Sequence, residues 1–552
     1  MNRILKPSPL AVKILVGVFA LCLLVVLSIW VVGTFFLKPF AGQKIQRAVY
    51  EKSDQLYQIQ LNELTYNPFT GKARITDVKL QADTARRRQL GKEAPDLIFE
   101  GNMPEISVQG FQLFSWLWGK KLSVEAIVLN QFDLRLTQFP NTKPDEPEVQ
   151  KTPYEMLNKQ FEHVKIGRIQ GDNWTVKQVD RRTKKVRTLS VQKLSWKVDD
   201  LLIDEKGHLD TTRLWYAKAI EVNLDSLVLP NQDLSASVQV KKIQLSTANK
   251  RLQIEGLGSI PSYPRMEYVR RTGNTSYTKA VVNHIELAGL DLSKYWLQKK
   301  VKVEVVTVEG GLVNAFEVRS RSSKMDGPRK PFPHQLYQQL PFQLDIDSVK
   351  VRQVDIVYDE LNPKTNQTGN VNFRRIKGVI VSLSNDSLRK TNVCKADFQA
   401  SFMGVSSLQT HFTFDMRSPR GQYTCAAELA TLDLRVLKST FKPLALMDIE
   451  TGIVDRFQFR FSGDQVKTSG SGTLLYHDLK IKILKPDEKK GFKIRDLFTF
   501  AANKVLMYES NPMPKKEVRQ GKISYERIPG ESFFGILWRS IRSCLSDSAL
   551  KT

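Results

Sequence analysis

Residues 349–358 of this 552-residue chain read Val-Lys-Val-Arg-Gln-Val-Asp-Ile-Val-Tyr, and this stretch decides the fold. Apolar side chains alternate with polar ones at Val349, Val351, Val354 and Ile356, which is the period of a half-buried β-strand. The step of three from Val351 to Val354 interrupts the alternation once, as a β-bulge does when it returns apolar side chains to the same face. We therefore predict a long strand in a curved sheet with one apolar and one polar face.

The same one-sided alternation recurs along most of the chain after residue 58. It is present at residues 59–66, 73–80, 220–224 and 234–245. Such strands predict a mainly β fold, in the form of an elongated, curved, repetitive antiparallel sheet with a few short helices. The sheet is expected to be groove-like or solenoid-like.

An internal repeat organises these strands. Residues 59–136 align with residues 238–315 at a constant offset of 179, so that Ile59 falls on Val238. A third, partial copy begins near Glu428, in a segment that matches the one at Glu286. The expected parts are β-repeat copy 1 at 58–237, β-repeat copy 2 at 238–425 and a partial β-repeat at 426–485.

The N-terminus carries a long apolar segment. Residues 14–37 contain no charged side chain, and at about 1.5 Å per residue a helix of this length exceeds the ~30 Å hydrocarbon core of a bilayer. A cleaved signal peptide usually has a shorter apolar core and a small-x-small cleavage site. We therefore predict an N-terminal transmembrane helix at 14–37, followed by a juxtamembrane helix at 38–57.

The flanking charges predict the orientation of this helix. Arg3, Lys6 and Lys13 precede it without an acidic residue, so the positive-inside rule places residues 1–13 in the cytoplasm and the body of the protein on the other side of the membrane.

Composition narrows the classes of protein and partner. With 41% hydrophobic and 25% charged residues, the chain has the composition of a folded protein. The net charge of +26 is spread over polar strand positions, without a nucleic-acid-binding signature, so we expect no nucleic acid as a partner. Two interpretations of this charge are open: the basic residues attract the protein to an anionic membrane surface, or they form a solvated basic face without a partner. Cys394 and Cys425 either pair or remain two free, buried thiols.

The C-terminal segment, 486–552, is predicted to be basic and helical. We expect helices at 494–507 and 532–545. The second has an apolar side, so it either lies on a membrane surface or caps the open end of the sheet. That side comprises Phe533, Phe534, Ile536, Leu537, Ile541 and Leu545.

No motif indicates catalysis. The six histidines are dispersed, and the chain lacks zinc-site spacings, phosphate-binding loops and a nucleophile elbow. The segment Ser469-Gly-Ser-Gly-Thr precedes an alternating strand and is interpreted as a turn. We predict no enzyme activity and no catalytic, cofactor-binding or metal-binding residues.

The apolar side of the sheet is the remaining candidate site. Too few amphipathic helices are predicted to cover it, so either sheets pack on each other or the face forms a groove that shelters acyl chains. Burial of each CH₂ group in such a groove gains roughly 0.8 kcal/mol. The candidate lining residues are Ile59, Leu61, Leu64, Tyr66, Ile75, Val78, Val238, Val240, Ile243, Leu245, Val349, Val351, Val354 and Ile356.

The chain resembles the AsmA-like family of bacterial envelope proteins, which includes TamB-like members and is related to lipid-transfer proteins with a repeating β-groove. The resemblance rests on the N-terminal anchor, on residues 64–78 and 110–136, and on the C-terminal segments 452–463 and 469–480. These are architectural patterns and carry no functional residues over.

The resemblance implies an inner-membrane anchor and a periplasmic body. On this basis we expect a single-pass protein that binds or moves phospholipid through a hydrophobic β-groove and supports outer-membrane biogenesis. The expected partners are the inner membrane, phospholipid acyl chains and an envelope or outer-membrane protein. The alternative is an interaction scaffold for outer-membrane protein assembly without lipid transfer.

Overall fold

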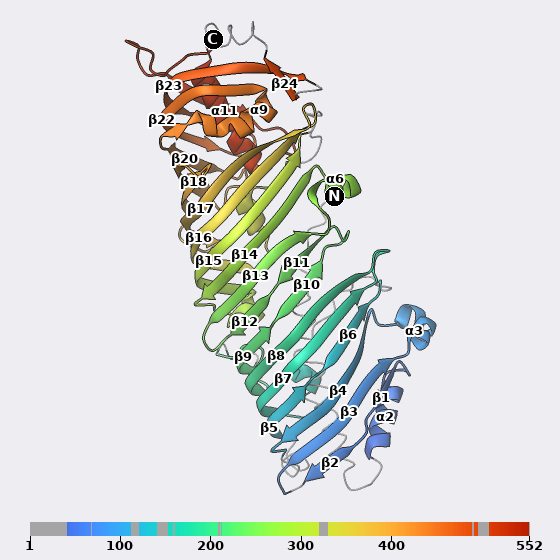
Figure 1. Ribbon diagram of the computed structural model, residues 1–552. Coiled ribbons are helices and arrows are strands. Elements are labelled where there is room, and N and C mark those ends of the chain that lie inside the picture. The colour runs from blue at the N-terminus through green and yellow to red at the C-terminus, as the bar shows by residue number, and fades with distance from the viewer. Residues whose placement is uncertain are drawn as a thin grey trace. The chain divides into compact units, whose positions relative to one another are not determined.

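The computed structural model in Figure 1 is mainly β, as predicted. The described residues are 41–67, 69–111, 121–140, 153–157, 161–207, 210, 212–319, 329–487, 491–494 and 507–550. The predicted helix at 14–37 lies outside the described residues, and so does the one at 494–507 apart from its two end residues. Ile494 is the last residue of the strand Gly491–Ile494 and Met507 forms a β-bridge with Leu550, so the prediction is wrong at these two positions. Among the described residues, the helices are all too short or too polar to cross a bilayer.

The chain divides into two compact units. Unit 1 comprises residues up to Ile254 together with Leu290–Lys299, and unit 2 comprises Glu255–Gly289 and the residues from Lys300 onward.

In unit 1, the long strand β3 pairs with β1 and β2 on one side and with β4 on the other. Strands β5 and β6 lie between β4 and β7, and β8 separates β7 from β9 and β10. The last pairs are β9 with β12 and β10 with β11. The strands are β1 Tyr57–Gln60, β2 Leu64–Asn67, β3 Lys72–Ala82, β4 Leu97–Gln109, β5 Lys121–Asn130, β6 Asp133–Gln138, β7 His163–Asp180, β8 Arg187–Ile203, β9 Ala217–Leu224, β10 Ser226–Pro230, β11 Ala236–Val240 and β12 Lys242–Ser246.

In unit 2, each strand from β14 to β20 pairs with the next, and β22 then pairs with β20, β21 and β23. Strand β23 also pairs with β24 and β25. The strands are β13 Arg251–Pro261, which begins in unit 1, β14 Ser276–Ala288, β15 Lys300–Val318, β16 Gln343–Asn362, β17 Gln367–Ser384, β18 Val393–Phe402, β19 Ser406–Asp415, β20 Tyr423–Leu429, β21 Leu432–Asp433, β22 Met447–Gly463, β23 Lys467–Asp487, β24 Gly491–Ile494 and β25 Gln520–Glu526.

The described helices are short, apart from α2 and α11. They are α2 Ala41–Lys52, α3 Thr84–Leu90, η1 Gly91–Glu93, α5 Pro153–Leu157, α6 Arg265–Thr272, α7 Tyr295–Gln298, α8 Pro333–Gln338, η3 Leu434–Leu437, α9 Lys438–Ala445 and α11 Phe533–Ala549. Helix α2 lies inside the segment predicted to be a juxtamembrane helix, and α11 extends the helix predicted at 532–545 by four residues.

The sheet is repetitive, and equivalent strands recur in the two units. Strands β3 and β13 are 179 residues apart, as are β4 and β14. Strand β7 is equivalent to β16 and runs parallel to β5 and β6, just as β16 runs parallel to β15. The expectation of a purely antiparallel sheet is therefore wrong at these two places. Each parallel pair is joined by a long connection that holds a short helix, which a parallel pair requires.

The predicted bulge in β16 is confirmed. The register between β16 and β17 shifts between Val351 and Val354. Gln353 lies within this shift and has a left-handed backbone with φ of 55°, and Gly310 in β15 and Arg375 in β17 are left-handed as well. The bend therefore crosses three neighbouring strands and explains why the apolar residues step by three.

Each unit has a hydrophobic core. The unit 1 core gathers buried side chains from β3 to β9, including Phe132, Trp174 and Trp196. The unit 2 core lies at the C-terminal strands and includes Phe461, Ile523 and residues of α11. Cys394 and Cys425 are free and buried, which matches the second of the two predicted alternatives.

Candidate functional site

The candidate site is an apolar face of unit 2 that spans β14 to β17. One row of directly paired residues crosses these four strands in the order Leu287, Val306, Val349 and Ile380. Residues paired directly across neighbouring strands point to the same face of a sheet. Val349 is 9% exposed, and the other three side chains are half-buried. The row is therefore an aliphatic strip at the surface of the sheet.

Parallel rows extend this strip along the strands. Ile285, Val308 and Val351 form the next row, and beyond the bend Val354 pairs with Ile376 and Ile356 with Phe373. We define the open apolar face by the residues of these rows. They are Ile285, Leu287, Val306, Val308, Val349, Val351, Val354, Ile356, Phe373, Ile376 and Ile380.

The same face continues into the unit 2 core. From Ile380 the row runs through Ala396 in β18, Phe412 in β19 and Cys425 in β20, and from there to Phe461 and Ile523. Ala396, Cys425, Phe461 and Ile523 are at most 3% exposed. The row thus passes from half-buried to fully buried without leaving the face.

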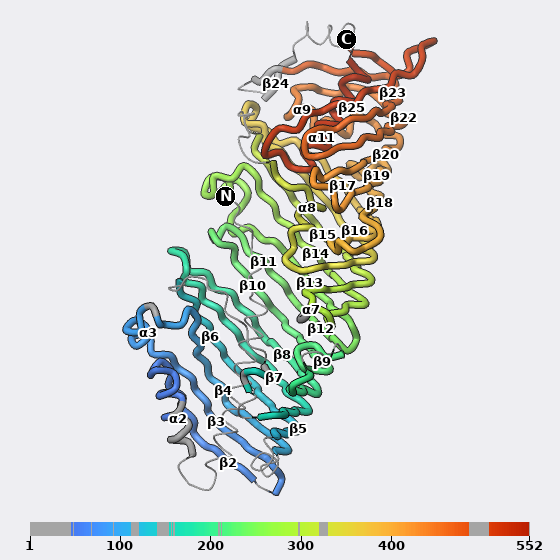
Figure 2. The backbone as a smooth tube through the Cα atoms, turned by 180° about the vertical axis from the view of Figure 1, so that it is seen from behind, coloured from blue at the N-terminus to red at the C-terminus, as the bar shows by residue number. Residues whose placement is uncertain are grey.

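Helix α11 covers the buried end of this row. It packs against β25 and β23, and Figure 2 shows it beside β25. A Cβ atom on Gly472 of β23 would lie 2.8 Å from Cys544 Sγ of α11, and one on Gly521 of β25 would clash with Ser548. The glycines of the Ser469–Thr473 segment therefore lie inside β23, and the predicted turn is wrong. The glycine at position 472, which suggested a turn, is explained by the close packing of a helix on the strand.

Two further helices bound the open apolar face at the strand ends. Leu444 of α9 packs over Gly369, and the Pro443 carbonyl accepts a hydrogen bond of 2.7 Å from Asn362 Nδ2. At the opposite ends of β16 and β17, the Tyr337 hydroxyl of α8 donates to the carbonyls of Leu344 and Leu383. Burial raises the pKa of Tyr337. Among the described helices, α9 also packs on β16 and β17, and α6 contacts β14.

The equivalent face of unit 1 is filled by three aromatic rings. Trp174 lies edge-on to Phe132 and to Trp196, with ring centroids 4.8 and 5.3 Å apart. Trp174 is fully buried, and its indole N–H donates to the Leu129 carbonyl at 2.5 Å.

In unit 2 the equivalent positions carry little bulk. Gly311 stands in place of Phe132 and Val354 in place of Trp174, at offsets of 179 and 180. Val351 is the equivalent of Gly171. Because Gly171 pairs with Trp196 and Val351 pairs with Gly378, Gly378 stands in place of Trp196. The ring of Phe398 occupies the space beside Gly378. The two units thus share strands and register, but Phe132, Trp174 and Trp196 of unit 1 have no ring at the equivalent positions of unit 2, where Phe398 covers Gly378 alone.

The predicted lining residues fall into three groups. Val349, Val351, Val354 and Ile356 lie on the open apolar face. Ile75 is buried in the unit 1 core, and Leu61, Leu64, Tyr66, Val78 and Ile243 pack against it, so these six line a filled core. Val240 is buried, Val238 is 40% exposed, and Ile59 and Leu245 are half-buried.

Sequence reasoning missed the members of the open apolar face that come from β14, β15 and β17. In β15 the run Val305-Val306-Thr307-Val308 contains adjacent valines, so its alternation does not assign a face. The cross-strand register is the signal that assigns Val306 and Val308.

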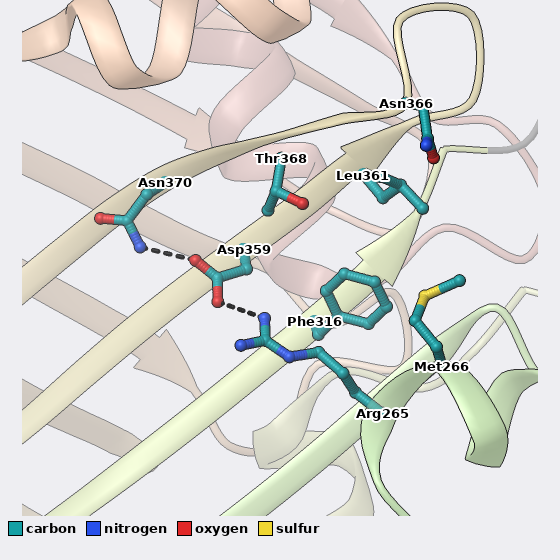
Figure 3. Close-up of a pocket in the computed structure, with 8 residues that line it drawn as sticks. All are labelled: Arg265, Met266, Phe316, Asp359, Leu361, Asn366, Thr368 and Asn370. Atoms are coloured by element: carbon teal, nitrogen blue, oxygen red, sulfur yellow. Dashed lines mark hydrogen bonds and ion pairs between the residues drawn. The ribbon is translucent and has the colours of Figure 1, made fainter.

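The polar side of unit 2 has a shallow cavity of about 480 Å³. Figure 3 shows Arg265 of α6 bridging to Asp359 of β16, which also accepts a hydrogen bond from Asn370. Phe316 and Met266 line the same cavity. Because the charged groups satisfy one another, the cavity is explained as the junction where α6 packs on the sheet.

No family model matches the chain, and no curated protein matches it.

Proposed function

We propose that this protein binds phospholipid acyl chains on the open apolar face of unit 2. The observation that carries the proposal is the contrast between the two units, in which Phe132, Trp174 and Trp196 of unit 1 are replaced by Gly311, Val354 and Gly378. A largely aliphatic surface that lacks these three rings gains free energy when flexible hydrocarbon covers it, by roughly 25 cal/mol per Å².

The wider role follows from the N-terminal segment and the family resemblance. We infer that residues 14–37 anchor the chain in the inner membrane, with the body in the periplasm, and that bound phospholipid moves along the sheet in support of outer-membrane biogenesis. The residues that we assign to the site bind by contact alone, so this function involves no catalytic residue.

The alternative proposal is a scaffold that recruits a partner by strand addition. Strand addition needs unpaired N–H and C=O groups along an exposed edge. At β25, the backbone N–H of Lys522 donates to Asp547 and that of Ser524 to Ser543, both on α11. These contacts occupy two donors of β25, and for this reason we favour lipid binding.

The direct test is native mass spectrometry of the full chain extracted in mild detergent. We expect one or more phospholipids to remain bound, because the open apolar face is otherwise exposed to water. A chain that is folded and free of lipid would contradict the proposal.

Site-specific crosslinking locates the lipid. The photoreactive residue benzoylphenylalanine replaces Val351, and in a matched control it replaces Lys350, the exposed neighbour on the opposite face of β16. We expect lipid crosslinks from position 351 and few from position 350. Equal crosslinking from both positions would show that the lipid is bound elsewhere or without specificity.

A further inference from the structure

Helix α11 carries a line of apolar side chains along the border of the side that is packed on the sheet. Residues 533, 536, 537, 540, 544 and 548 are buried against the sheet or the unit 2 core. Phe534 and Trp538, by contrast, are 73% and 53% exposed. Ile541 and Leu545 continue the same line, but they are half-buried because they also pack against the unit 2 core. The spacing of four, three and four residues places these four side chains on one face of the helix, which we call the outer stripe.

Basic residues border the outer stripe. Arg542 follows Trp538 by one helical turn and is exposed, and it has no carboxylate partner among the described residues. Arg539 is also exposed but pairs with Glu531 at 2.8 Å. The only acidic side chain on the helix itself, Asp547, accepts a hydrogen bond from the backbone N–H of Lys522. The border of the outer stripe is therefore cationic.

The side chains of the outer stripe match one kind of surface. Tryptophan is enriched where hydrocarbon meets water in a membrane, because its ring is apolar and its N–H is polar. Helices that lie in this interface combine aromatic and aliphatic side chains on one side with basic residues beside them, which bind anionic headgroups. An isolated exposed leucine is ordinary on a protein surface, whereas two large rings one turn apart beside an unpaired arginine are not.

We propose that the outer stripe of α11 docks on the surface of an anionic phospholipid bilayer, with Phe534 and Trp538 inserted at the interface and Arg542 beside a lipid phosphate. The buried side of α11 keeps the helix attached to β23 and β25 while the outer stripe enters the interface. The contact adds a membrane-binding site at the C-terminal end of the sheet. It does not depend on the lipid-binding function proposed for the open apolar face.

The test uses the full chain with a single environment-sensitive label. In a background in which Cys22 is replaced by serine, Phe534→Cys carries a nitrobenzoxadiazole dye, and Ser546→Cys carries it in a matched control on the exposed polar side of α11. The remaining cysteines, Cys394, Cys425 and Cys544, are buried and are not expected to react. Detergent-solubilised protein is diluted into vesicles of phosphatidylglycerol and phosphatidylcholine, or of phosphatidylcholine alone.

We expect the dye at position 534 to brighten severalfold and shift to the blue with the anionic vesicles, and the dye at 546 to change little. Arg542→Glu should reduce the response at position 534 to the level seen with phosphatidylcholine alone. The apolar segment at 14–37 is common to all variants, so it does not explain a difference between positions 534 and 546. An unchanged dye at 534, or equal changes at both positions, would overturn the proposal.

A second measurement separates a membrane from a protein partner. Benzoylphenylalanine at Trp538 should crosslink to phospholipid in intact cells, and a discrete polypeptide adduct without lipid would overturn the proposal. The double variant Phe534→Ser/Trp538→Ser should lose the lipid adduct at a neighbouring position of α11, while Leu388→Ser, which removes an 87% exposed residue elsewhere in unit 2, should not. Retention of phospholipid by this double variant in native mass spectrometry distinguishes loss of docking from loss of binding at the open apolar face.

Discussion

Replacing Val354 by tryptophan should fill the open apolar face without unfolding the protein. Val354 is equivalent to Trp174, which fits in unit 1 beside the rings of Phe132 and Trp196. In unit 2 Val354 pairs with Gly311, which has no side chain and leaves room on the β15 side of the face. Val351 stands where unit 1 has Gly171, and a Cβ atom on Gly171 would lie 2.6 Å from the Trp174 indole nitrogen, so the new ring has to turn toward Gly311 and away from Val351. The variant therefore adds to unit 2 one of the three rings that fill the face of unit 1.

The expected size of the effect comes from contact area. A buried aromatic side chain covers roughly 150–250 Å². If about 100 Å² of the lining is covered by the indole in place of an acyl chain, the lipid loses about 2.5 kcal/mol at about 25 cal/mol per Å². That loss corresponds to a roughly 70-fold weaker affinity.

Native mass spectrometry of the detergent-extracted full chain measures the bound lipid, and thermal unfolding followed by circular dichroism measures stability. We expect Val354→Trp to lose most of its phospholipid while it remains folded, with at most a small decrease in melting temperature. Lys350→Trp, which places the same ring on the opposite face of β16, should keep both properties. A folded Val354→Trp variant with wild-type lipid content would refute the assignment of the open apolar face.

Three further predictions concern stability and reactivity. Burial lowers the pKa of His334 from 6.5 to about 4, so the unfolded chain alone binds this proton and stability falls as pH drops from 6.5 toward 4, by about 3 kcal/mol. Urea unfolding at several pH values should show this loss in the wild type and not in His334→Phe. The same dependence of the free energy of unfolding on pH in both proteins would contradict the prediction. Gly521→Val should lower the free energy of unfolding by about 1–3 kcal/mol and speed hydrogen exchange in α11, because the valine side chain clashes with Ser548. Lys522→Ala should change neither property. Burial raises the pKa of the thiols of Cys394 and Cys425 to about 11 and about 12, so neither should react with iodoacetamide at neutral pH before unfolding, and mass spectrometric detection of alkylation in the folded protein would contradict this.

Local periodicity was enough to predict the strands and the bend. The step from Val351 to Val354 locates the register shift between β16 and β17, because a bulge changes the alternation within one strand. Strand direction is not encoded in alternation, and so the parallel pairing of β15 with β16 was missed. The signal was the length of the connection after Val318, which is far longer than a hairpin and holds α8.

The difference between a filled and an open face required the register. Phe132 aligns with Gly311 and Trp174 with Val354 in the sequence, and both pairs show a loss of bulk in the second copy. The replacement of Trp196 by Gly378 emerged only from strand pairing, because the offset changes between β7 and β8. A sequence pattern therefore gives the apolar side of each strand, while the volume left on that side depends on which residues of neighbouring strands meet.

An apolar face that is exposed to water favours aggregation. In unit 2 this face is kept apart from the sheet edge at β25. The open apolar face lies on β14 to β17, where β15, β16 and β17 are hydrogen-bonded on both sides. At β25, two backbone donors are occupied by Asp547 and Ser543 of α11. A sheet associates with another sheet most readily where unpaired backbone groups and apolar side chains coincide. Because α11 both covers the buried end of the face and blocks β25, loss of its packing should expose both features together. We therefore expect Gly521→Val to increase aggregation of the full chain in light scattering more than Val354→Trp does.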